Sequence, residues 1–503
     1  MSLLGIEVGT TGCRAIAVSL DGTVRARARS DYSVIVGPGG TRELDCATVW
    51  AAVREVIAEI ASKTRHDPVK ALSVGSMAEP MTPISREGHI LDHCILGTDS
   101  RGENYLPRVE EAVGRQRIFD ITGNTPAPDY ALPKLCWVRD NAPELYQNTW
   151  RFIPWAALVT HLLGGASTCD YSLANRTLLF DITEARWSRR MLDACGLSAA
   201  KLPEPVPAGS PAGTVAAPLA RELGLSTDVR LVVGGHTLCC NALGAGVDDS
   251  HMAAFTLGAS LHMMPTFHAI PLRNMMLANG LNMAHHVVPG LFVSFFYNRS
   301  GGRVLRWFRE TLAPLETREV QKRGASIYTT LLAEMPEEPT RLMVLPHFAP
   351  TGPPAFDTRS SGVILGLDLS TSRGEIIKAL IEGMTYYFWE GQDLFRQVGI
   401  RIDRYRATGG GARADEWLQL AADILGLPVE RTAMLDTAPL GAAILAGAGS
   451  GAFADVREGV EALVHVTHHF EPDARRHAIY EERLARYREL YPLLRDYLHS
   501  LRT

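Results

Sequence analysis

The chain has 503 residues, of which 46% are hydrophobic and 21% charged, and a formal net charge of -5. These are ordinary values for a globular protein, and the length exceeds what one hydrophobic core supports, so we expect two large domains. The negative charge argues against nucleic acid as the main partner, and no apolar run is long enough to span a membrane. The first strand begins without a basic segment before it, which predicts a cytoplasmic protein. The eight scattered cysteines are expected to be buried free thiols.

The first 32 residues predict three strands joined by two tight turns. Apolar runs at 3–8 and 15–20 are separated by the turn Gly9-Thr10-Thr11-Gly12, and Asp21-Gly22 ends the second run. We expect the glycines to supply the positive φ of such turns. A Gly- and Thr-rich turn exposes backbone N–H groups and hydroxyls, which suit phosphate oxygens. Glu7 is placed to reach a Mg²⁺ ion that accompanies the phosphates.

The segment GIEVGTTGCRA, residues 5–15, resembles the first phosphate loop of the FGGY carbohydrate kinases. The resemblance implies an α/β protein with two actin-like (ribonuclease H-like) domains around a central cleft. We place the sugar-binding domain at residues 1–248 and the nucleotide-binding domain at residues 249–503. The family usually has Asp at the position of Glu7, the implied metal contact. The residues implied to contact phosphate here are Gly9, Thr10, Thr11 and Arg14.

A helical pattern at 45–63 and an apolar strand at 71–74 lead into the loop at residues 75–80. Ligands of doubly wound sheets bind beyond the carboxyl ends of strands, so this loop is placed to touch a substrate. In the resembling family it holds sugar hydroxyls. The substrate candidates are Met77, Ala78 and Glu79, although an exposed loop glutamate is most simply explained as a solvated side chain.

Asp99 and Arg101 stand two residues apart in an extended segment, so their side chains share one side and are able to hold a polyol. The alternative is a loop ion pair, which contributes little to stability. The FGGY pattern has Trp where this chain has Gly97. Residues 133–165 and 170–187 resemble further family segments, and packing roles are expected for several of them, including Trp137 and Trp187.

The apolar strand and small-residue helix at 231–247 meet at the junction Gly235-His236-Thr237. In the resembling family this junction carries an Asp, the general base that takes the proton from the attacking sugar hydroxyl. The aligned residue is Thr237. Its hydroxyl is not deprotonated near neutral pH without an activating base of its own, so it does not replace that Asp.

Three explanations for the absence of an acid at Thr237 stay open. His236 has an ordinary pKa that suits proton abstraction, but it points to the opposite side from its neighbour. Glu79 or Asp99 is a second choice, if either lies across the cleft. The third is that phosphoryl transfer is lost or weakened, because a missing base lowers the rate roughly 10²- to 10⁴-fold.

Two further glycine-containing loops match the family. The segment 253–260 resembles its second phosphate loop, and the strand at 404–408 runs into a glycine triplet that flanks adenosine in actin-like ATPases. Residues 417–429 and 439–447 continue the family pattern. The cofactor-binding residues implied are Gly258, Ala259, Ser260, Gly409, Gly410 and Gly411. Ala259 replaces a usual hydroxyl residue, and together with Glu7 and Thr237 it suggests relaxed or retuned catalysis.

The resemblance extends over about residues 4–486 and implies an ATP-dependent carbohydrate kinase of the FGGY type, acting on a small sugar or polyol with ATP and Mg²⁺. The alternative from a different class is an inactive FGGY relative that works as a sugar or nucleotide sensor or as a partner protein. The identity of the sugar and the oligomeric state are left open, with a homodimer among the options.

Overall fold

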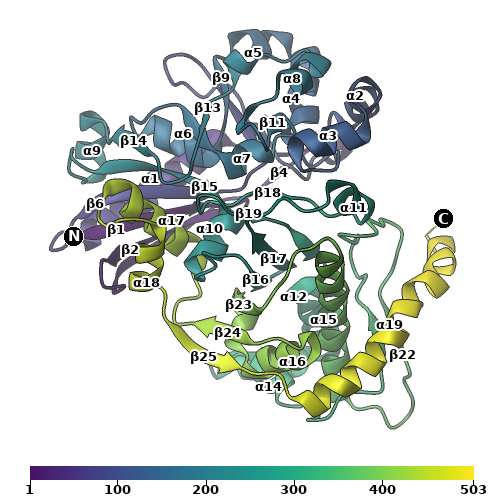
Figure 1. Ribbon diagram of the computed structural model, residues 1–503. Helices are drawn as coiled ribbons and strands as arrows, with labels where there is room; N and C mark the ends of the chain where they lie inside the picture. Colours follow the sequence, from purple (N-terminus) through teal and green to yellow (C-terminus); the bar gives the residue numbers. More distant parts are fainter. Residues whose placement is uncertain (503) are drawn as a thin grey trace.

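The computed structural model describes residues 1–502, which form two lobes, each built around one mixed β-sheet (Figure 1). The strands of the N-terminal sheet, in spatial order, are β14 (Pro211–Thr214), β15 (Arg230–His236), β6 (Val69–Ser76), β1 (Ser2–Val8), β2 (Gly12–Ser19) and β3 (Val24–Asp31). The strands of the C-terminal sheet are β18 (Ala284–His285), β19 (Phe292–Val293), β17 (Leu261–Phe267), β16 (Met252–Leu257), β23 (Arg404–Thr408), β24 (Val429–Thr432) and β25 (Val466–Phe470), with β20 (Phe296–Asn298) beside β17.

The same strand topology occurs in both lobes. In the N-terminal sheet β1 is antiparallel to β2 and parallel to β6, which is parallel to β15. In the C-terminal sheet β16 is antiparallel to β17 and parallel to β23, which is parallel to β24. This repeat of a hairpin followed by parallel strands confirms the predicted α/β fold with two actin-like lobes.

Helices cover both faces of the N-terminal sheet. Even-numbered residues of β1, such as Ile6, face a core shared with α1 (Cys46–Lys63) and α6 (Trp155–Leu162). The opposite face packs on α10 (Thr237–Gly244) and α17 (Thr437–Ser450), and α18 (Val456–Leu463) packs on α17. The remaining helices of the N-terminal lobe are α2 (Leu106–Val113), α3 (Arg115–Thr122), α4 (Ala131–Asn141), α5 (Pro143–Asn148), α7 (Tyr171–Asn175), α8 (Arg189–Cys195) and α9 (Ala217–Leu223).

The C-terminal lobe has its largest core around the long helix α15 (Arg373–Gln397), which packs on α16 (Asp415–Leu425). Its other helices are α11 (Arg273–Ala278), α12 (Gly301–Leu312), α13 (Pro314–Lys322), α14 (Ile327–Leu332) and α19 (Ala474–Ser500). Short strands pair as β4 (Ile35–Val36), β5 (Arg42–Leu44) and β8 (Cys94–Ile95); β7 (Met81–Ile84) and β9 (Arg151–Pro154); β10 (Thr168–Asp170) and β13 (Glu204–Val206); β11 (Phe180–Asp181) and β12 (Arg186–Trp187); and β21 (Met343–Leu345) and β22 (Val363–Leu365).

Helix α17 comes late in the chain yet lies against β1, so it ties the C-terminal lobe to the N-terminal sheet (Figure 1). Two glycines permit this close packing. A Cβ on Gly5 would lie 1.8 Å from the carbonyl oxygen of Pro439, and one on Gly441 would lie 1.9 Å from that of Cys240. The backbones of β1, α10 and α17 therefore touch with no side chain between them.

The predicted opening hairpins are confirmed as β1, β2 and β3, but the reason given for the first turn was wrong. Gly22 has φ of +82°, as expected, whereas neither Gly9 nor Gly12 is among the residues with positive φ. Gly12 is needed for space instead, because a Cβ there would lie 2.6 Å from Oδ1 of Asp31 on the neighbouring strand.

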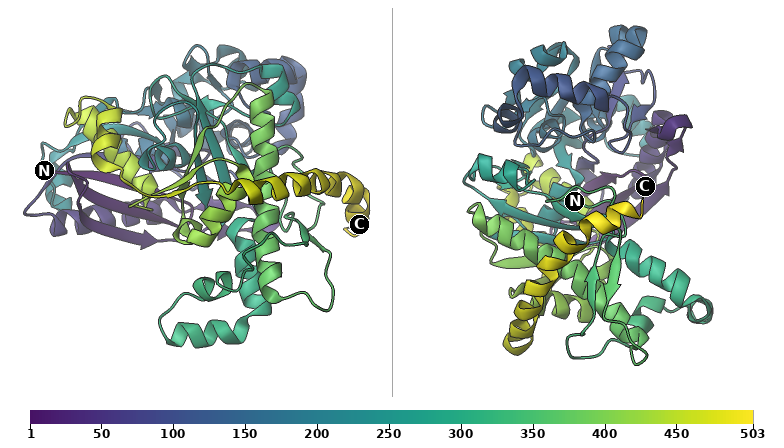
Figure 2. Two further views of the ribbon diagram at one scale, coloured as in Figure 1. Left: turned by 60° about the horizontal axis from the view of Figure 1, so that its bottom comes forward. Right: turned by 90° about the vertical axis from the view of Figure 1, so that its right-hand side faces the viewer.

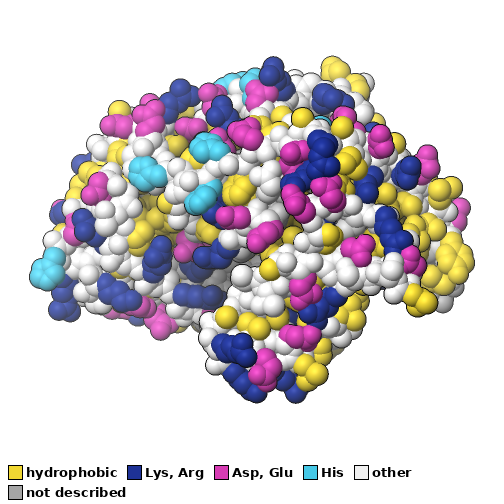
Figure 3. Space-filling view, turned by 90° about the horizontal axis from the view of Figure 1, so that it is seen from below, with side chains coloured by type: hydrophobic (Ala, Val, Ile, Leu, Met, Phe, Trp, Pro, Cys, Tyr) yellow, Lys and Arg dark blue, Asp and Glu magenta, His cyan; other side chains and the backbone are white. Residues whose placement is uncertain are grey.

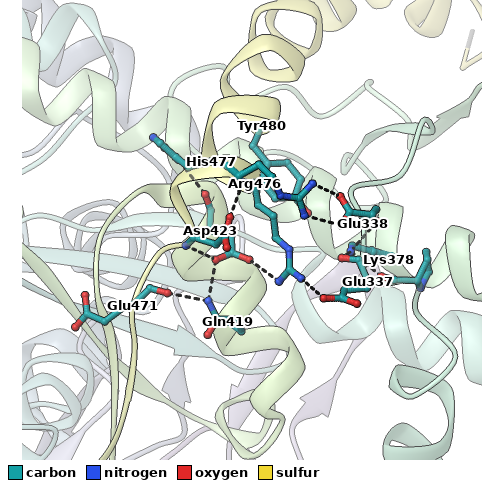
Figure 4. A network of polar contacts seen from close by, with 12 residues as sticks. Glu337, Glu338, Lys378, Gln419, Asp423, Glu471, Arg476, His477 and Tyr480 are labelled. Atoms are coloured by element: carbon teal, nitrogen blue, oxygen red, sulfur yellow. Dashed lines mark hydrogen bonds and ion pairs between the residues drawn. The ribbon is translucent and has the colours of Figure 1, made fainter.

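A polar network fastens α19 to the rest of the C-terminal lobe (Figure 4). Asp423 accepts hydrogen bonds from Gln419 and from the backbone N–H of Asp473, 2.8 and 2.9 Å long, and its carboxylate lies 3.6 Å from Arg476. Lys378 donates to three successive backbone carbonyls at 336–338. The family-like residues Gln419 and Asp423 thus hold the C-terminal helix, which lies across α15 (Figure 2).

The structure also describes the cysteines and the apolar character of the helices. All eight cysteines are buried free thiols, as predicted. None of the helices within residues 1–502 has the length and apolar character that crossing a membrane requires.

Candidate active site between the lobes

Two of the three predicted nucleotide loops are in direct contact. Because β16 and β23 are adjacent and parallel, with Thr256 beside Thr408, the loops that follow them lie side by side. Gly409 has φ of +83°, and a Cβ there would lie 2.9 Å from the carbonyl oxygen of Leu257. The start of α12 closes the group, since the N–H of Gly302 donates to the carbonyl of Gly258 over 3.0 Å. The glycine loops at 258–260 and 409–411 therefore form one backbone-lined wall.

Helix α10 connects this wall to the first loop. Its Asn241 donates to the hydroxyls of Thr256 and Thr408 over 2.9 and 3.1 Å, and accepts a hydrogen bond from Thr437 at the start of α17. One turn earlier on the same helix face, Thr237 donates to Oε1 of Glu7 over 3.0 Å. A single helix face thus reaches the ends of β1, β16 and β23, the three strands that lead into the predicted loops.

Glu7 lies at the carboxyl end of β1, on the face that looks toward α10 and α17. Its Oε2 accepts a hydrogen bond from Arg14, 2.5 Å away, and its side chain is 13% exposed. Arg14 also lies 3.7 Å from Asp436, the residue before α17. The N-termini of α10 and α17 both lie here, and their partial positive charge, together with Arg14, offsets the carboxylates of Glu7 and Asp436.

The donor set at Glu7 does not fit a protein-held magnesium ion. One carboxylate oxygen is bound by the Arg14 cation and the other by the Thr237 hydroxyl. Within residues 1–502 there is no group of three or more His, Cys, Asp or Glu side chains that would hold a metal. Mg²⁺ commonly binds through substrate phosphates and retained waters, so the predicted contact of Glu7 with such an ion stays a prediction.

A second group of side chains lines the region next to His236, on the N-terminal lobe. Arg176 donates to Oε1 of Glu79 through Nε and Nη2, over 2.9 and 2.7 Å, and its guanidinium lies 4.6 Å above the ring of Tyr130. Phe295 of the C-terminal lobe lies 5.6 Å from the same guanidinium. Acceptor, donor and aromatic surfaces meet here, a combination that suits a small polyhydroxylated ligand.

His236 and Thr237 face different partners, as expected for consecutive residues at a strand end. The ring of His236 is buried edge-on to Phe295 at 5.4 Å, and its Nδ1 has no hydrogen-bond partner. Burial, the charge of Arg176 and nearby His262 hold the pKa of His236 well below its ordinary value. The neutral imidazole is therefore a weak proton acceptor but is free to hydrogen-bond a ligand hydroxyl.

The remaining substrate candidates are less accessible than the sequence suggested. Asp99 is 1% exposed and accepts hydrogen bonds from Arg101 and from the N–H of Arg42, and these contacts hold its pKa below the ordinary value despite burial. This arrangement favours the ion-pair interpretation over a polyol clamp. Met77 and Ala78 are buried, and a cavity of about 160 Å³ is bordered by Glu79 and Arg101.

The two lobes meet across this region through a charged pair. Arg299 of the C-terminal lobe lies 3.1 Å from Asp129 of the N-terminal lobe and 5.6 Å from the ring of Tyr297.

Seen from below, the surface is hollowed where the lobes meet, and Lys and Arg side chains gather beside the hollow (Figure 3). A basic border suits a polyphosphate ligand.

Sequence reasoning missed three residues that the fold brings to this region. Arg176 was noted only as part of a family-like segment, and its partner Glu79 is 97 residues away. Asn241 was not singled out. His262, whose Nε2 lies 2.8 Å from the hydroxyl of Ser260, has its pKa lowered to about 4, mainly by burial. The only sequence signal for His262 was its place two residues after the second glycine loop.

Comparison with known proteins gives a consistent assignment. Models of the N-terminal and C-terminal domains of the FGGY family of carbohydrate kinases match residues 2–244 and 256–450. The xylulose kinase of Bacillus subtilis is 26% identical over 503 residues, which cover 100% of this chain and 99% of that protein. A glycerol kinase of Koribacter versatilis is 27% identical over 467 residues, covering 90% of each chain. The crystal structure of xylulose kinase from Rhodospirillum rubrum superposes with a TM-score of 0.87 over 99% of this chain and 100% of that one, at 24% identity. The chain therefore belongs to the FGGY family of carbohydrate kinases.

Proposed function

We propose that this protein transfers the γ-phosphoryl group of ATP to a hydroxyl of a small sugar or polyol, and that xylulose is the first acceptor to test. Several relatives that match nearly the whole chain are named xylulose kinases, which motivates that choice. The observation that carries the proposal is the position of α10. Its first residues lie between the Glu7–Arg14 pair, where we place the phosphates, and the polar and aromatic side chains around Arg176, where we place the sugar.

The residues divide into three tasks. Glu79, held by Arg176, and the unpartnered Nδ1 of His236 would bind and orient sugar hydroxyls. Phe295 and Tyr130 would exclude water from the acceptor. ATP supplies the transferable phosphoryl group, with Mg²⁺ as is usual in the family. Phosphoryl transfer depends mainly on positioning and charge stabilisation, which these groups are able to provide.

The glycine loops would hold the nucleotide. We expect the turns at 9–12 and 258–260 to donate backbone N–H groups to phosphate oxygens, and the triplet at 409–411 would let an adenine ring approach the backbone closely. The N-termini of α10 and α17 add positive potential where the phosphates would lie.

A catalytically inactive sensor or partner protein is the second candidate. Thr237 supports it, because the sequence resemblance aligns this hydroxyl with the residue that serves as general base in the family. Ala259 removes a further hydroxyl from the second loop. Such a protein would keep the ligand-binding surfaces without turnover.

The two candidates differ in a simple assay. A kinase releases ADP from Mg·ATP only when an acceptor is added, so we would test xylulose, other pentoses and ketoses, and glycerol with a coupled ADP assay. A sensor instead shows ligand-dependent thermal stabilisation with no ADP release above the no-acceptor rate. Acceptor-dependent ADP release supports the kinase, and its absence across the panel would refute it.

A further inference from the structure

A histidine of the C-terminal lobe lies between the second glycine loop and the side chains around Arg176. We propose that His262 holds the acceptor hydroxyl beside the loop at 258–260, so that the acceptor and the nucleotide strengthen each other's binding. The inference rests on the kinase function proposed above. It adds a polar contact from β17 to the sugar contacts of the N-terminal lobe.

His262 belongs to a row of side chains that crosses the C-terminal sheet on the face toward α10. Directly paired residues of neighbouring strands point to the same face of a sheet. From β23 through β16 and β17 to β20, the paired residues are Thr408, Thr256, His262 and Tyr297. The two threonine hydroxyls bond to Asn241 of α10, which fixes the direction of this face. His262 therefore points to the junction of the lobes, while its two chain neighbours belong to the core.

The two ends of the row lie beside different ligand regions. The threonine end leads into the two glycine loops. At the other end, burial raises the pKa of Tyr297, while the charges of Arg299 and Arg176 lower it, so these cations are close to its ring. The rings of His262 and Tyr297 lie 5.9 Å apart, and His262 also contributes to the low pKa of His236. His262 thus adjoins both regions.

The two ring nitrogens of His262 have different surroundings. Nε2 lies 2.8 Å from the hydroxyl of Ser260, whose carbonyl accepts a hydrogen bond from the N–H of Gly258 across the loop. Nδ1 is buried and has no hydrogen-bond partner among residues 1–502. An unpaired buried polar atom costs about 1–3 kcal/mol, so a ligand hydroxyl that reached Nδ1 would supply a bond that the protein itself does not make.

The bond to Ser260 sets the role of Nδ1. A serine hydroxyl that donates its proton to a phosphate oxygen accepts from Nε2–H of His262, which leaves Nδ1 of the neutral ring as an acceptor. Burial and the charge of Arg299 lower the pKa of His262 to about 4, so the ring is neutral near pH 7. The sugar hydroxyl would donate its hydrogen to Nδ1 and keep its oxygen lone pairs free to face the γ-phosphorus.

The test measures coupling between the two ligands in the full-length protein. Calorimetric titration with Mg²⁺ and AMPPNP, an ATP analogue that keeps a γ-phosphate, is done with and without xylulose or the acceptor found in the ADP assay. In wild type the acceptor should tighten AMPPNP binding at least about fivefold. In His262→Phe we expect this factor to fall below about twofold and the acceptor KM to rise at least about tenfold, with binding of AMPPNP alone within about threefold of wild type.

A conservative variant separates the ligand contact from a structural role. His262→Asn puts an amide near the position of Nδ1 and too far from Ser260 to bond to it, so it should bring the acceptor KM back to within about threefold of wild type while the coupling stays lost. His161→Phe is the matched control. This half-buried histidine of α6 has its Nδ1 3.1 Å from the carbonyl oxygen of Gly165, and its replacement should leave the KM and the coupling unchanged.

The inference is overturned if His262→Phe has the acceptor KM and the coupling of wild type. It is also overturned if wild type phosphorylates an acceptor that leaves the affinity for AMPPNP unchanged. If wild type releases no ADP with any acceptor, the kinase proposal is refuted separately. In that case, coupling between xylulose and AMPPNP that disappears in His262→Phe would still support the contact, and the lack of such coupling would overturn it.

Discussion

Asn241 offers a sharp test of how the two lobes are held together, because its amide joins four elements. Replacement by alanine removes its hydrogen bonds to Thr256, Thr408 and Thr437. Thr256 and Thr408 remain bonded to each other over 2.9 Å, so the largest loss falls on Thr437, which is 1% exposed. At about 1 kcal/mol for each bond, with a further penalty for the unsatisfied hydroxyl, we expect Asn241→Ala to lower the free energy of unfolding by about 2–4 kcal/mol.

The same variant should affect nucleotide binding. Thr256 and Thr408 lie two residues and one residue before the two glycine loops. Without the Asn241 amide to hold them, we expect the KM for ATP to rise by about tenfold, equivalent to about 1.4 kcal/mol. Urea unfolding followed by circular dichroism measures the first effect, and ADP release at varied ATP measures the second. Asn141→Ala is the control, because Asn141 is exposed and makes one bond, to the carbonyl of Trp137. Unfolding within 0.5 kcal/mol of wild type (about the scatter of surface substitutions), together with an unchanged KM, would refute this account of α10.

Three further changes test other parts of the structure. Arg176→Met should raise the KM for the acceptor at least about tenfold and leave ADP binding unchanged, because it frees Glu79 from its ion pair. Gly5→Ala should destabilise the protein by about 3 kcal/mol or more in urea unfolding, since the new Cβ would meet the carbonyl of Pro439 at 1.8 Å. Burial lowers the pKa of His347 to about 4, so the folded protein holds this side chain neutral. Its full contribution to the free energy of unfolding is present above the ordinary pKa of 6.5 and is lost as the pH falls from 6.5 toward 4, where only the unfolded chain takes up the proton. His347→Gln should therefore lose about 2 kcal/mol less than wild type between pH 7 and pH 5.

Each of these changes has a contrary outcome. An Arg176→Met enzyme with an unaltered acceptor KM would place the sugar elsewhere. A Gly5→Ala protein as stable as wild type would mean that β1 and α17 separate without cost. If His347→Gln and wild type lose stability in parallel between pH 7 and pH 5, His347 does not remain neutral in the folded protein.

Local sequence patterns predicted individual elements of the fold. The Gly-Thr turn, the Asp-Gly turn and the apolar runs around them gave the first three strands, and the apolar spacing at 45–63 gave α1. These signals act over a few residues, so they can be read from the chain directly. Family resemblance added the fold with two actin-like domains and the order of the loops.

The site was harder to predict because its contacts join distant residues. Nothing near Glu79 indicates that Arg176 binds it, and nothing near Glu7 indicates that Thr237, 230 residues later, donates to its carboxylate. From the family resemblance we expected an acid to be missing from α10, and the nearby acid on β1 had been assigned to a metal. The two residues are brought together because β1 packs against α17, which in turn packs against α10.

The most direct test of the central claim is the identity of the product. Incubation of the protein with Mg·ATP and xylulose, followed by ³¹P NMR, should show a new phosphomonoester signal that grows as ADP appears in equal amount. Loss of ATP signal to inorganic phosphate alone, or no change with xylulose and the other acceptors, would contradict the assignment of this chain as a working sugar kinase.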